Sequence, residues 1–155
     1  MKIAIAFATL SGNTLAVAQE IESYLESKGI STTIYDLLEA NADDFKKYDL
    51  VFLGGSTYSD GDLNPIAEMF FGAAGAHHHT CDHTKFALFA LGDSSYPQFA
   101  QSGQVMFEKL QQMDACILSP TLELDGPPTE EMISKVKSWV DDMLEKNSSG
   151  ARYSH

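Results

Sequence analysis

The sequence predicts an α/β fold in which a doubly wound, five-stranded parallel sheet is covered by helices on both faces. Two observations predict it: five apolar or β-branched runs occur along the chain, and five segments with helical periodicity lie between or after them. Strands of a parallel sheet are buried on both faces, so they form continuous apolar runs. The alternation of such strands with helices is typical of βαβ units.

The first half of the chain contains three of the expected strands and two of the expected helices. In order, we expect a strand at 2–8, a helix at 14–29, a strand at 31–37, a short helix at 39–48 and a strand at 49–56. The helix at 14–29 has apolar residues every three or four positions and stops at Gly29, a residue type common at helix ends.

The second half continues the alternation. In order, we expect a helix at 63–74, a strand at 85–95, a helix at 101–113, a strand at 115–126 and a helix at 128–146. Pro120 interrupts the last strand, because proline cannot donate a hydrogen bond to the ladder. The sole tryptophan, Trp139, is expected in the core. We expect residues 1–146 to form a single domain and residues 147–155 to form a mobile tail.

The composition excludes several classes of partner. The chain has 10 basic and 22 acidic residues and a net charge of -12, so we expect no binding to nucleic acid. No apolar segment approaches the roughly 20 residues of a membrane span, and no signal peptide is evident. Cys81 and Cys116 form no C-x-x-C pattern, which favours a reduced, cytoplasmic setting. An acidic surface favours solubility and attracts basic partner proteins.

Polar loops follow the first, third and fourth strands, and ligands of open parallel sheets bind beyond the carboxyl ends of strands. The first loop, TLSGNT at 9–14, offers hydroxyls, an amide and a glycine before a helix, but no lysine or arginine. Unpaired N–H groups and the helix dipole favour an anion there, so the loop predicts a phosphate site without formal positive charge. An ordinary helix cap is the alternative, although one serine or asparagine would suffice for that.

The other two loops carry aromatic residues among small polar ones. STYSDGD at 56–62 contains Tyr58, and GDSSYPQF at 92–99 contains Tyr96 and Phe99. Two tyrosines on neighbouring loops beside a phosphate site predict stacking on the faces of a flat ring. The alternative is that both tyrosines only cover the core.

These three loops, in this order, resemble those of the flavodoxin family and of the FMN-binding domains of diflavin reductases. The family's opening pattern, an aromatic residue before [ST]-x-x-[AGC]-x-T-x-x-x-A, is matched by Phe7, Thr9, Gly12, Thr14 and Ala18. The resemblance spans nearly the whole chain and implies the strand order 2-1-3-4-5. No long insertion interrupts the fifth strand, which resembles the short-chain kind.

The resemblance implies FMN as the cofactor and assigns its contacts. The phosphate would be held by Thr9, Leu10, Ser11, Gly12, Asn13 and Thr14, and the ring by Ser56, Thr57, Tyr58, Ser59, Asp60, Gly61, Leu91, Gly92, Asp93, Tyr96 and Phe99. Tyr96 matches the residue that stacks on the outer face of the isoalloxazine ring, and Tyr58 matches the residue on the other face. Asp93 would lie near the polar edge of the ring.

The implied function is that of a low-potential electron carrier with no substrate chemistry, no catalytic residue and no metal. Its expected partners are an NAD(P)H-dependent flavodoxin reductase or similar donor and redox acceptor enzymes with basic docking surfaces, and we expect a monomer. The alternatives are a binding or regulatory module without useful redox cycling and a small FMN-dependent reductase. A signalling receiver domain shares the strand order, but no lysine follows the fourth strand here.

Ser59 and the histidine-rich segment at 77–83 are unusual features of the sequence. The residue after the inner aromatic is commonly glycine in the family and is Ser59 here, so we expect the one-electron-reduced flavin to be less stabilised than in Ser59→Gly. The segment 77–83 holds His77, His78, His79, Cys81 and His83. Such spacing can bind metal, but the preferred interpretation is a solvated connector.

Overall fold

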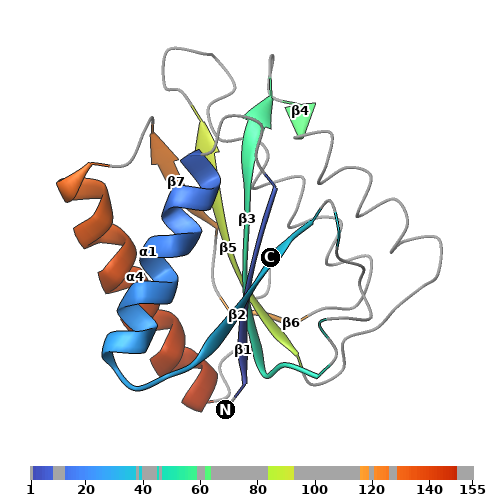
Figure 1. The fold of residues 1–155 in the computed structure, drawn as a ribbon, viewed down its shortest axis with the longest axis vertical. Helices are drawn as coiled ribbons and strands as arrows, with labels where there is room; N and C mark the ends of the chain where they lie inside the picture. Colours follow the sequence, from blue (N-terminus) through green and yellow to red (C-terminus); the bar gives the residue numbers. More distant parts are fainter. Residues whose placement is uncertain are drawn as a thin grey trace.

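A parallel sheet forms the centre of the molecule (Figure 1). The computed structural model describes residues 2–8, 13–37, 39, 45, 47–58, 62–63, 84–92, 116–118, 121–125 and 129–149. Its four longest strands are β1 (Ile3–Ala8), β2 (Thr32–Asp36), β3 (Leu50–Tyr58) and β5 (Lys85–Gly92). They lie in the order β2-β1-β3-β5, and every pairing among them is parallel. The fold class and the strand order are therefore confirmed.

The fifth position of the sheet is shared by two short strands. β6 (Cys116–Ile117) and β7 (Leu122–Asp125) both pair in parallel with β5, β6 near its start and β7 near its end. The predicted strand at 115–126 is thus present with a break, and Pro120 lies in the break, outside the described residues. A break at this point agrees with the interruption predicted there, since proline has no N–H to donate to a ladder.

One strand was not predicted. β4 (Asp62–Leu63) pairs antiparallel with the end of β3, with Tyr58 opposite Asp62 and Thr57 opposite Leu63. The loop between Tyr58 and Asp62 has three residues and ends in Gly61, a length and residue type common in β-hairpins. The Asp60-Gly61 pair is the sequence signal for this hairpin.

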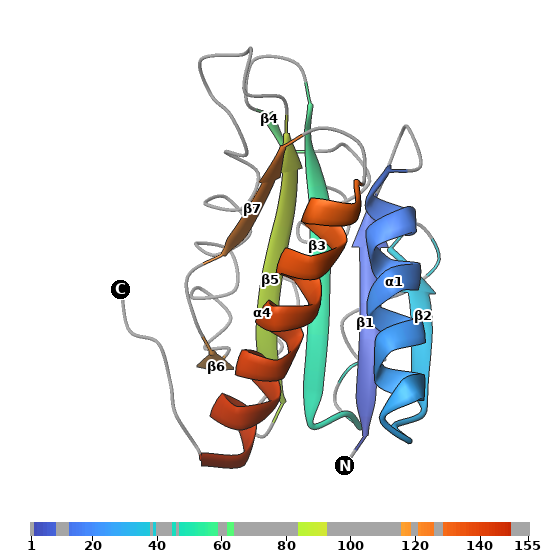
Figure 2. The same cartoon turned by 90° about the vertical axis from the view of Figure 1, so that its left-hand side faces the viewer.

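Both described helices cover the same face of the sheet. α1 (Asn13–Ser27) and α4 (Glu130–Ser149) lie side by side and run antiparallel to the strands (Figure 2). The predicted helices at 63–74 and 101–113 lie outside the described residues, apart from Leu63 in β4. Only part of the predicted helix at 39–48 is described. Helices on the opposite face of the sheet therefore stay a prediction.

α4 continues to Ser149, past Lys146, where we expected the helix to end. Near its end, Lys85 Nζ donates a hydrogen bond to the carbonyl oxygen of Asn147 at 3.1 Å. The last carbonyl groups of a helix lack intrahelical donors and carry partial negative charge, so a lysine there stabilises the extra turn. This lysine comes from a distant strand, which explains why local sequence did not show the extension.

Residues on both faces of the sheet are buried, as predicted for these strands. On the face toward α1 and α4, the fully buried residues include Ile3, Ile5, Leu50, Phe52 and Phe89. On the opposite face they include Ala4, Ala6, Val51, Leu53 and Leu88. Trp139 of α4 packs edge-on against Phe52, with ring centroids 5.4 Å apart, which confirms its place in the core.

α1 ends in a regular Schellman motif. Gly29 has φ of 80°, a conformation that costs glycine little. Its N–H bonds the carbonyl of Glu26 at 2.9 Å, and the N–H of Ile30 bonds the carbonyl of Leu25 at 3.0 Å. These bonds satisfy two carbonyl groups that the helix leaves open, and the stop predicted at Gly29 is confirmed.

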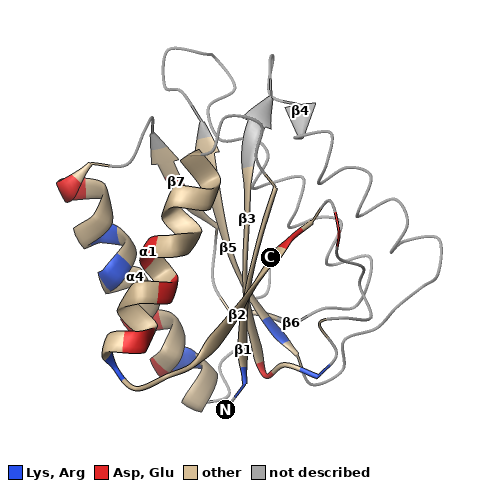
Figure 3. Ribbon diagram, viewed as in Figure 1, with Lys and Arg blue, Asp and Glu red and all other residues tan. Residues whose placement is uncertain are grey.

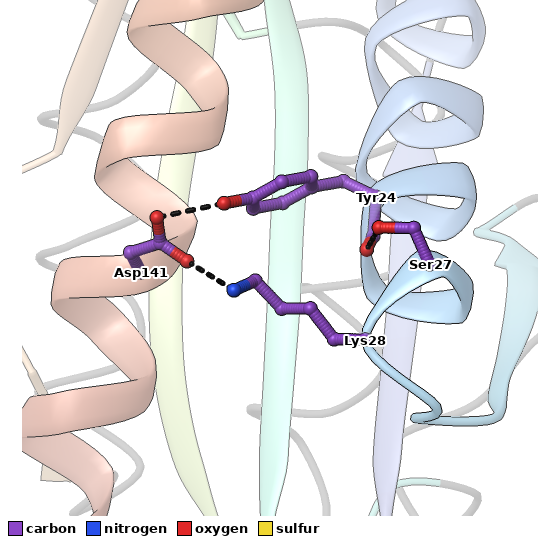
Figure 4. Close-up of polar contacts among 4 residues, drawn as sticks. All are labelled: Tyr24, Ser27, Lys28 and Asp141. Carbon is purple, nitrogen blue, oxygen red and sulfur yellow. Dashed lines mark hydrogen bonds and ion pairs between the residues drawn. The ribbon is translucent and has the colours of Figure 1, made fainter.

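A polar clamp joins the two helices at the surface (Figure 4). The Tyr24 hydroxyl donates to Asp141 Oδ2 at 2.7 Å, and Lys28 Nζ lies 3.1 Å from Asp141 Oδ1. The hydrogen bond from Tyr24, followed by that from Lys28, lowers the pKa of Asp141. The same contact with Asp141 raises the pKa of Tyr24. The clamp fixes the C-terminal end of α1 against the middle of α4, far from the N-terminus of α1.

Candidate functional site

The carboxyl ends of the parallel strands lie at one edge of the sheet, where both described helices also begin (Figure 1). The register joins these ends: Ala8 of β1 lies opposite Gly55 of β3, and Gly92 of β5 lies opposite Asp125 of β7. This is the edge at which open α/β sheets bind ligands. We call it the carboxyl edge.

The predicted site residues that the structure describes all lie at the carboxyl edge. They are Asn13 and Thr14 at the start of α1, Ser56, Thr57 and Tyr58 at the end of β3, and Leu91 and Gly92 at the end of β5. The register places Ser56 opposite Leu91. The remaining predicted residues lie outside the described part of the chain: Thr9, Leu10, Ser11, Gly12, Ser59, Asp60, Gly61, Asp93, Tyr96 and Phe99.

Among the described side chains, that of Thr14 most clearly lacks a hydrogen-bond partner. It is fully buried, and its Oγ1 makes no hydrogen bond. Among the described side chains, the only other buried polar atoms in this condition are Thr32 Oγ1 and Trp139 Nε1. A buried hydroxyl without a partner costs about 1–3 kcal/mol, so its position at a helix start fits a ligand that supplies the missing acceptor.

The first turn of α1 is favourable for an anion. The first N–H groups of a helix have no intrahelical acceptor, and the helix dipole places positive potential there. No acidic side chain occupies this turn to satisfy them. Thr14 adds a buried hydroxyl donor to the same turn. The chemistry of these donors fits a phosphate group.

No cationic side chain assists this anion site within the described residues. The described strand ends and first helical turns at the carboxyl edge contain no lysine or arginine, and Figure 3 shows the described lysines elsewhere. A bound phosphate would keep much of its negative charge, because dipoles and hydroxyls do not neutralise it. The site therefore disfavours the addition of a further negative charge nearby.

The β3–β4 hairpin adds an element that sequence reasoning missed. Thr57 pairs with Leu63 and Tyr58 with Asp62, so the first two residues of the predicted ring-binding loop at 57–61 belong to the ladder between β3 and β4. This ladder extends β3 beyond Ser56, the last residue of β3 that pairs with β5. Asp125, at the end of β7, also lies at the carboxyl edge and was not predicted there as a site residue; its signal was the position at the end of the fifth strand.

Other kinds of site find no support in the described part of the chain. Among described residues, no group of three or more histidine, cysteine or acidic side chains is placed to hold a metal. The segment 77–83, with its four histidines, lies outside them. No described helix is both long and apolar enough to span a membrane.

Comparison with known proteins identifies relatives along most of the chain. The family model for flavodoxin matches residues 5–139. A probable flavodoxin of Bacillus subtilis is 29% identical over 144 residues, which cover 92% of this chain and 90% of that protein. NADPH oxidoreductase A of Dictyostelium discoideum is 31% identical over 125 residues, 79% of this chain but only 20% of that protein.

Solved structures share the same architecture. Oxidised flavodoxin 2 of Bacillus cereus superimposes with a TM-score of 0.87 at 28% identity, covering 94% of this chain and 99% of that one. Flavodoxin 1 of the same organism gives a TM-score of 0.83 at 27% identity, with 94% and 98% covered. The similarity extends over nearly the full length of both proteins.

Proposed function

Because this chain belongs to the flavodoxin family of FMN-binding electron-transfer proteins, we propose that its carboxyl edge holds FMN with the phosphate at the mouth of α1. The observation that carries this assignment is the Thr14 hydroxyl, fully buried at the helix start and without a partner. A phosphate oxygen there would accept its hydrogen bond. Residues 9–14 would complete the cradle with backbone N–H groups and further hydroxyls.

The ring is assigned to the ends of β3 and β5. Residues 57–61 begin with the last two residues of β3, and residues 91–99 begin with the last two residues of β5; the two strands pair at Ser56 and Leu91. We assign Tyr58 to the inner face of the ring and Tyr96 to the outer face, with Asp93 near the polar edge. Ladder pairing of Tyr58 with Asp62 supports this role, since it anchors the backbone that carries the inner aromatic residue.

FMN, when bound, supplies the electron chemistry by taking up and releasing electrons singly. The protein's own residues set the electrostatic conditions. The described carboxyl edge has no cation to offset the phosphate, and the whole chain has a net charge of -12. Both features oppose a second negative charge on the ring, so we expect the second reduction to occur at low potential.

Members of this family exchange electrons with reductases and acceptor proteins, and some relatives are parts of longer reductases. For this chain we propose an NAD(P)H-dependent flavodoxin reductase or similar donor, and acceptors with basic docking surfaces that complement its acidic charge. We further propose a cytoplasmic monomer without substrate chemistry, formed by one domain that includes α4 to Ser149.

A reductive titration tests the proposed function. Purified protein, reconstituted with FMN, is titrated with dithionite under anaerobic conditions while the visible spectrum is recorded. We expect stoichiometric FMN binding and reduction in two resolved one-electron steps. Failure of the apoprotein to bind FMN at micromolar concentration would refute the proposal. Binding without reversible reduction would instead support the regulatory module.

A further inference from the structure

Gly54 lies between two aromatic residues on the face of the sheet that α1 and α4 cover. The register places Gly54 of β3 opposite Phe7 of β1 on one side and Phe89 of β5 on the other. Phe89 is fully buried, and Phe7 is 6% exposed. A residue without a side chain is thus flanked by two buried phenylalanines.

The space above Gly54 is filled by the Phe89 ring. A Cβ atom at Gly54 would lie 2.7 Å from Cδ2 of Phe89 and closer still to Cε2 and Cζ. Real Cβ atoms do not approach ring carbons so closely, so one of the two residues would have to move. Among the described glycines, only Gly29 has positive φ. Gly54 is therefore required for space and not for backbone conformation.

The Phe89 ring has little freedom to move aside. Trp139 of α4 packs on it with centroids 6.1 Å apart and an interplanar angle of 72°. The same indole packs on Phe52, which is also fully buried. Trp139 Nε1 has no hydrogen-bond partner, so packing alone holds the indole in place. Displacing Phe89 would therefore disturb a set of rings that spans β3, β5 and α4.

This contact lies at the middle of β3 and in the second half of β5, close to the residues of both strands that are assigned to the ring. Gly54 precedes Ser56 by two residues, and Phe89 precedes Leu91 by two residues. We propose that Gly54 is a positioning residue for the flavin ring: its missing side chain lets Phe89 lie against β3 and thereby sets the relative position of the ends of β3 and β5. The inference rests on the proposed function, because it concerns the same site.

The test compares Gly54→Ala with wild type and with a control that lowers stability elsewhere. The matched control is Thr84→Val: Thr84 is fully buried, and its Oγ1 lies 2.8 Å from the carbonyl oxygen of Tyr48 and 3.1 Å from that of Phe45, either of which accepts its one proton. Thr84 lies seven residues before Leu91, about 23 Å along the strand at roughly 3.3 Å per residue. It can destabilise the fold without touching the carboxyl edge.

FMN affinity and the visible circular dichroism of bound flavin are measured at a temperature where every apoprotein is folded. We expect Gly54→Ala to weaken the binding of FMN and of riboflavin by a similar factor, roughly tenfold. It should also change the circular dichroism of the flavin bands. Thr84→Val should lower the melting temperature but leave both readouts at the wild-type values. Equal FMN affinity and dichroism in wild type and Gly54→Ala would overturn the inference.

A second pair of variants tests the cause. In Gly54→Ala/Phe89→Leu the smaller side chain relieves the clash, so we expect FMN affinity within threefold of Phe89→Leu alone. If Gly54→Ala does not fold, the double variant should fold and show this affinity. A double variant that stays unfolded, or binds tenfold more weakly than Phe89→Leu, would refute the inference. Failure of wild type to bind FMN would instead refute the proposed function.

Discussion

The two described helices begin at the same edge of the sheet, but their first turns are built differently. α4 is satisfied by its own residues: Thr129 Oγ1 accepts the N–H of Met132 at 3.2 Å, and Glu130 and Glu131 supply negative charge in the first turn. α1 has no acidic residue in its first turn, and its buried Thr14 hydroxyl has no partner. Among the described residues, the start of α4 is capped and charged by its own side chains, whereas the start of α1 holds a buried hydroxyl whose missing partner a ligand can supply.

This difference shows what distinguishes a binding site from an ordinary helix start on the same fold. Topology brings both helix starts to the carboxyl edge, and both have the same dipole and open N–H groups. Side-chain chemistry then decides which start is left open for an anion. Three changes test this contrast, and a fourth tests the clamp that joins the same two helices.

The largest expected effect follows from removing the unpartnered hydroxyl. Thr14→Val keeps the shape of the side chain but deletes the donor. We expect FMN affinity to fall by about 1.5–3 kcal/mol, roughly 10- to 150-fold, the value of a hydrogen bond to a charged group. The apoprotein should be no less stable, because an unsatisfied buried group is lost. Thr14→Ser retains the hydroxyl and serves as the control. A less stable apoprotein with unchanged affinity would contradict the contrast.

The second change gives α1 the kind of charge that α4 already has. Asn13→Asp places a carboxylate in the first turn, where Asn13 is half-buried. The apoprotein should gain a few tenths of a kcal/mol from the helix dipole. FMN should bind about 1.4 kcal/mol more weakly, roughly tenfold, because the new charge repels the phosphate. Calorimetric titration at two salt concentrations checks this, and the penalty should shrink at high salt. If Asn13→Asp bound FMN more tightly than wild type, the phosphate could not lie at the N-terminus of α1.

The third change removes the cap of α4. Thr129→Ala deletes the acceptor for the N–H of Met132, and we expect the free energy of unfolding to fall by about 1 kcal/mol. FMN affinity should stay at the wild-type value, in contrast to Thr14→Val. Urea denaturation and FMN titration give the two quantities. A loss of affinity comparable to that in Thr14→Val would show that both helix starts serve the ligand.

The smallest expected effect concerns the clamp between the two helices. Tyr24, and after it Lys28, lower the pKa of Asp141 in the folded protein. A lowered pKa stabilises the fold above the ordinary value of about 3.9, and this stabilisation is lost as the pH falls through the lowered value. Asp141→Asn should therefore be less stable than wild type near neutral pH, and the difference should vanish in acid. Because the group is exposed, the effect should be small. A difference independent of pH would argue against the ionic clamp.

The fold was predictable because its central signals are local or depend on simple periodicity. The apolar run at 2–8 and the glycine at the end of α1 specified a buried strand and a helix stop directly. The β3–β4 hairpin was missed because β4 has only two residues. The extension of α4 was missed because its stabilising contact comes from Lys85, which is distant in sequence.

The edge of the sheet at which the candidate site lies was predictable from the sequence, but contacts within the candidate site were not. Sequence order placed Thr14, Tyr58 and Leu91 at one edge, and the structure confirms that placement. The missing partner of Thr14 was not visible from the sequence, because hydroxyls at helix starts usually cap the helix. The close approach of Phe89 to Gly54 was also not visible from the sequence. It arises only when β3 and β5, which are separated by a long connection, pair with each other.

The ring contacts of α4 give the protein an internal optical reporter. Trp139 is the sole tryptophan of the chain, and its indole lies against Phe52 and Phe89 with no hydrogen bond to its N–H. An indole in such surroundings fluoresces at shorter wavelength than one in water. Its emission therefore reports on a single interface, the seam between α4 and the sheet, and reddens when that seam opens.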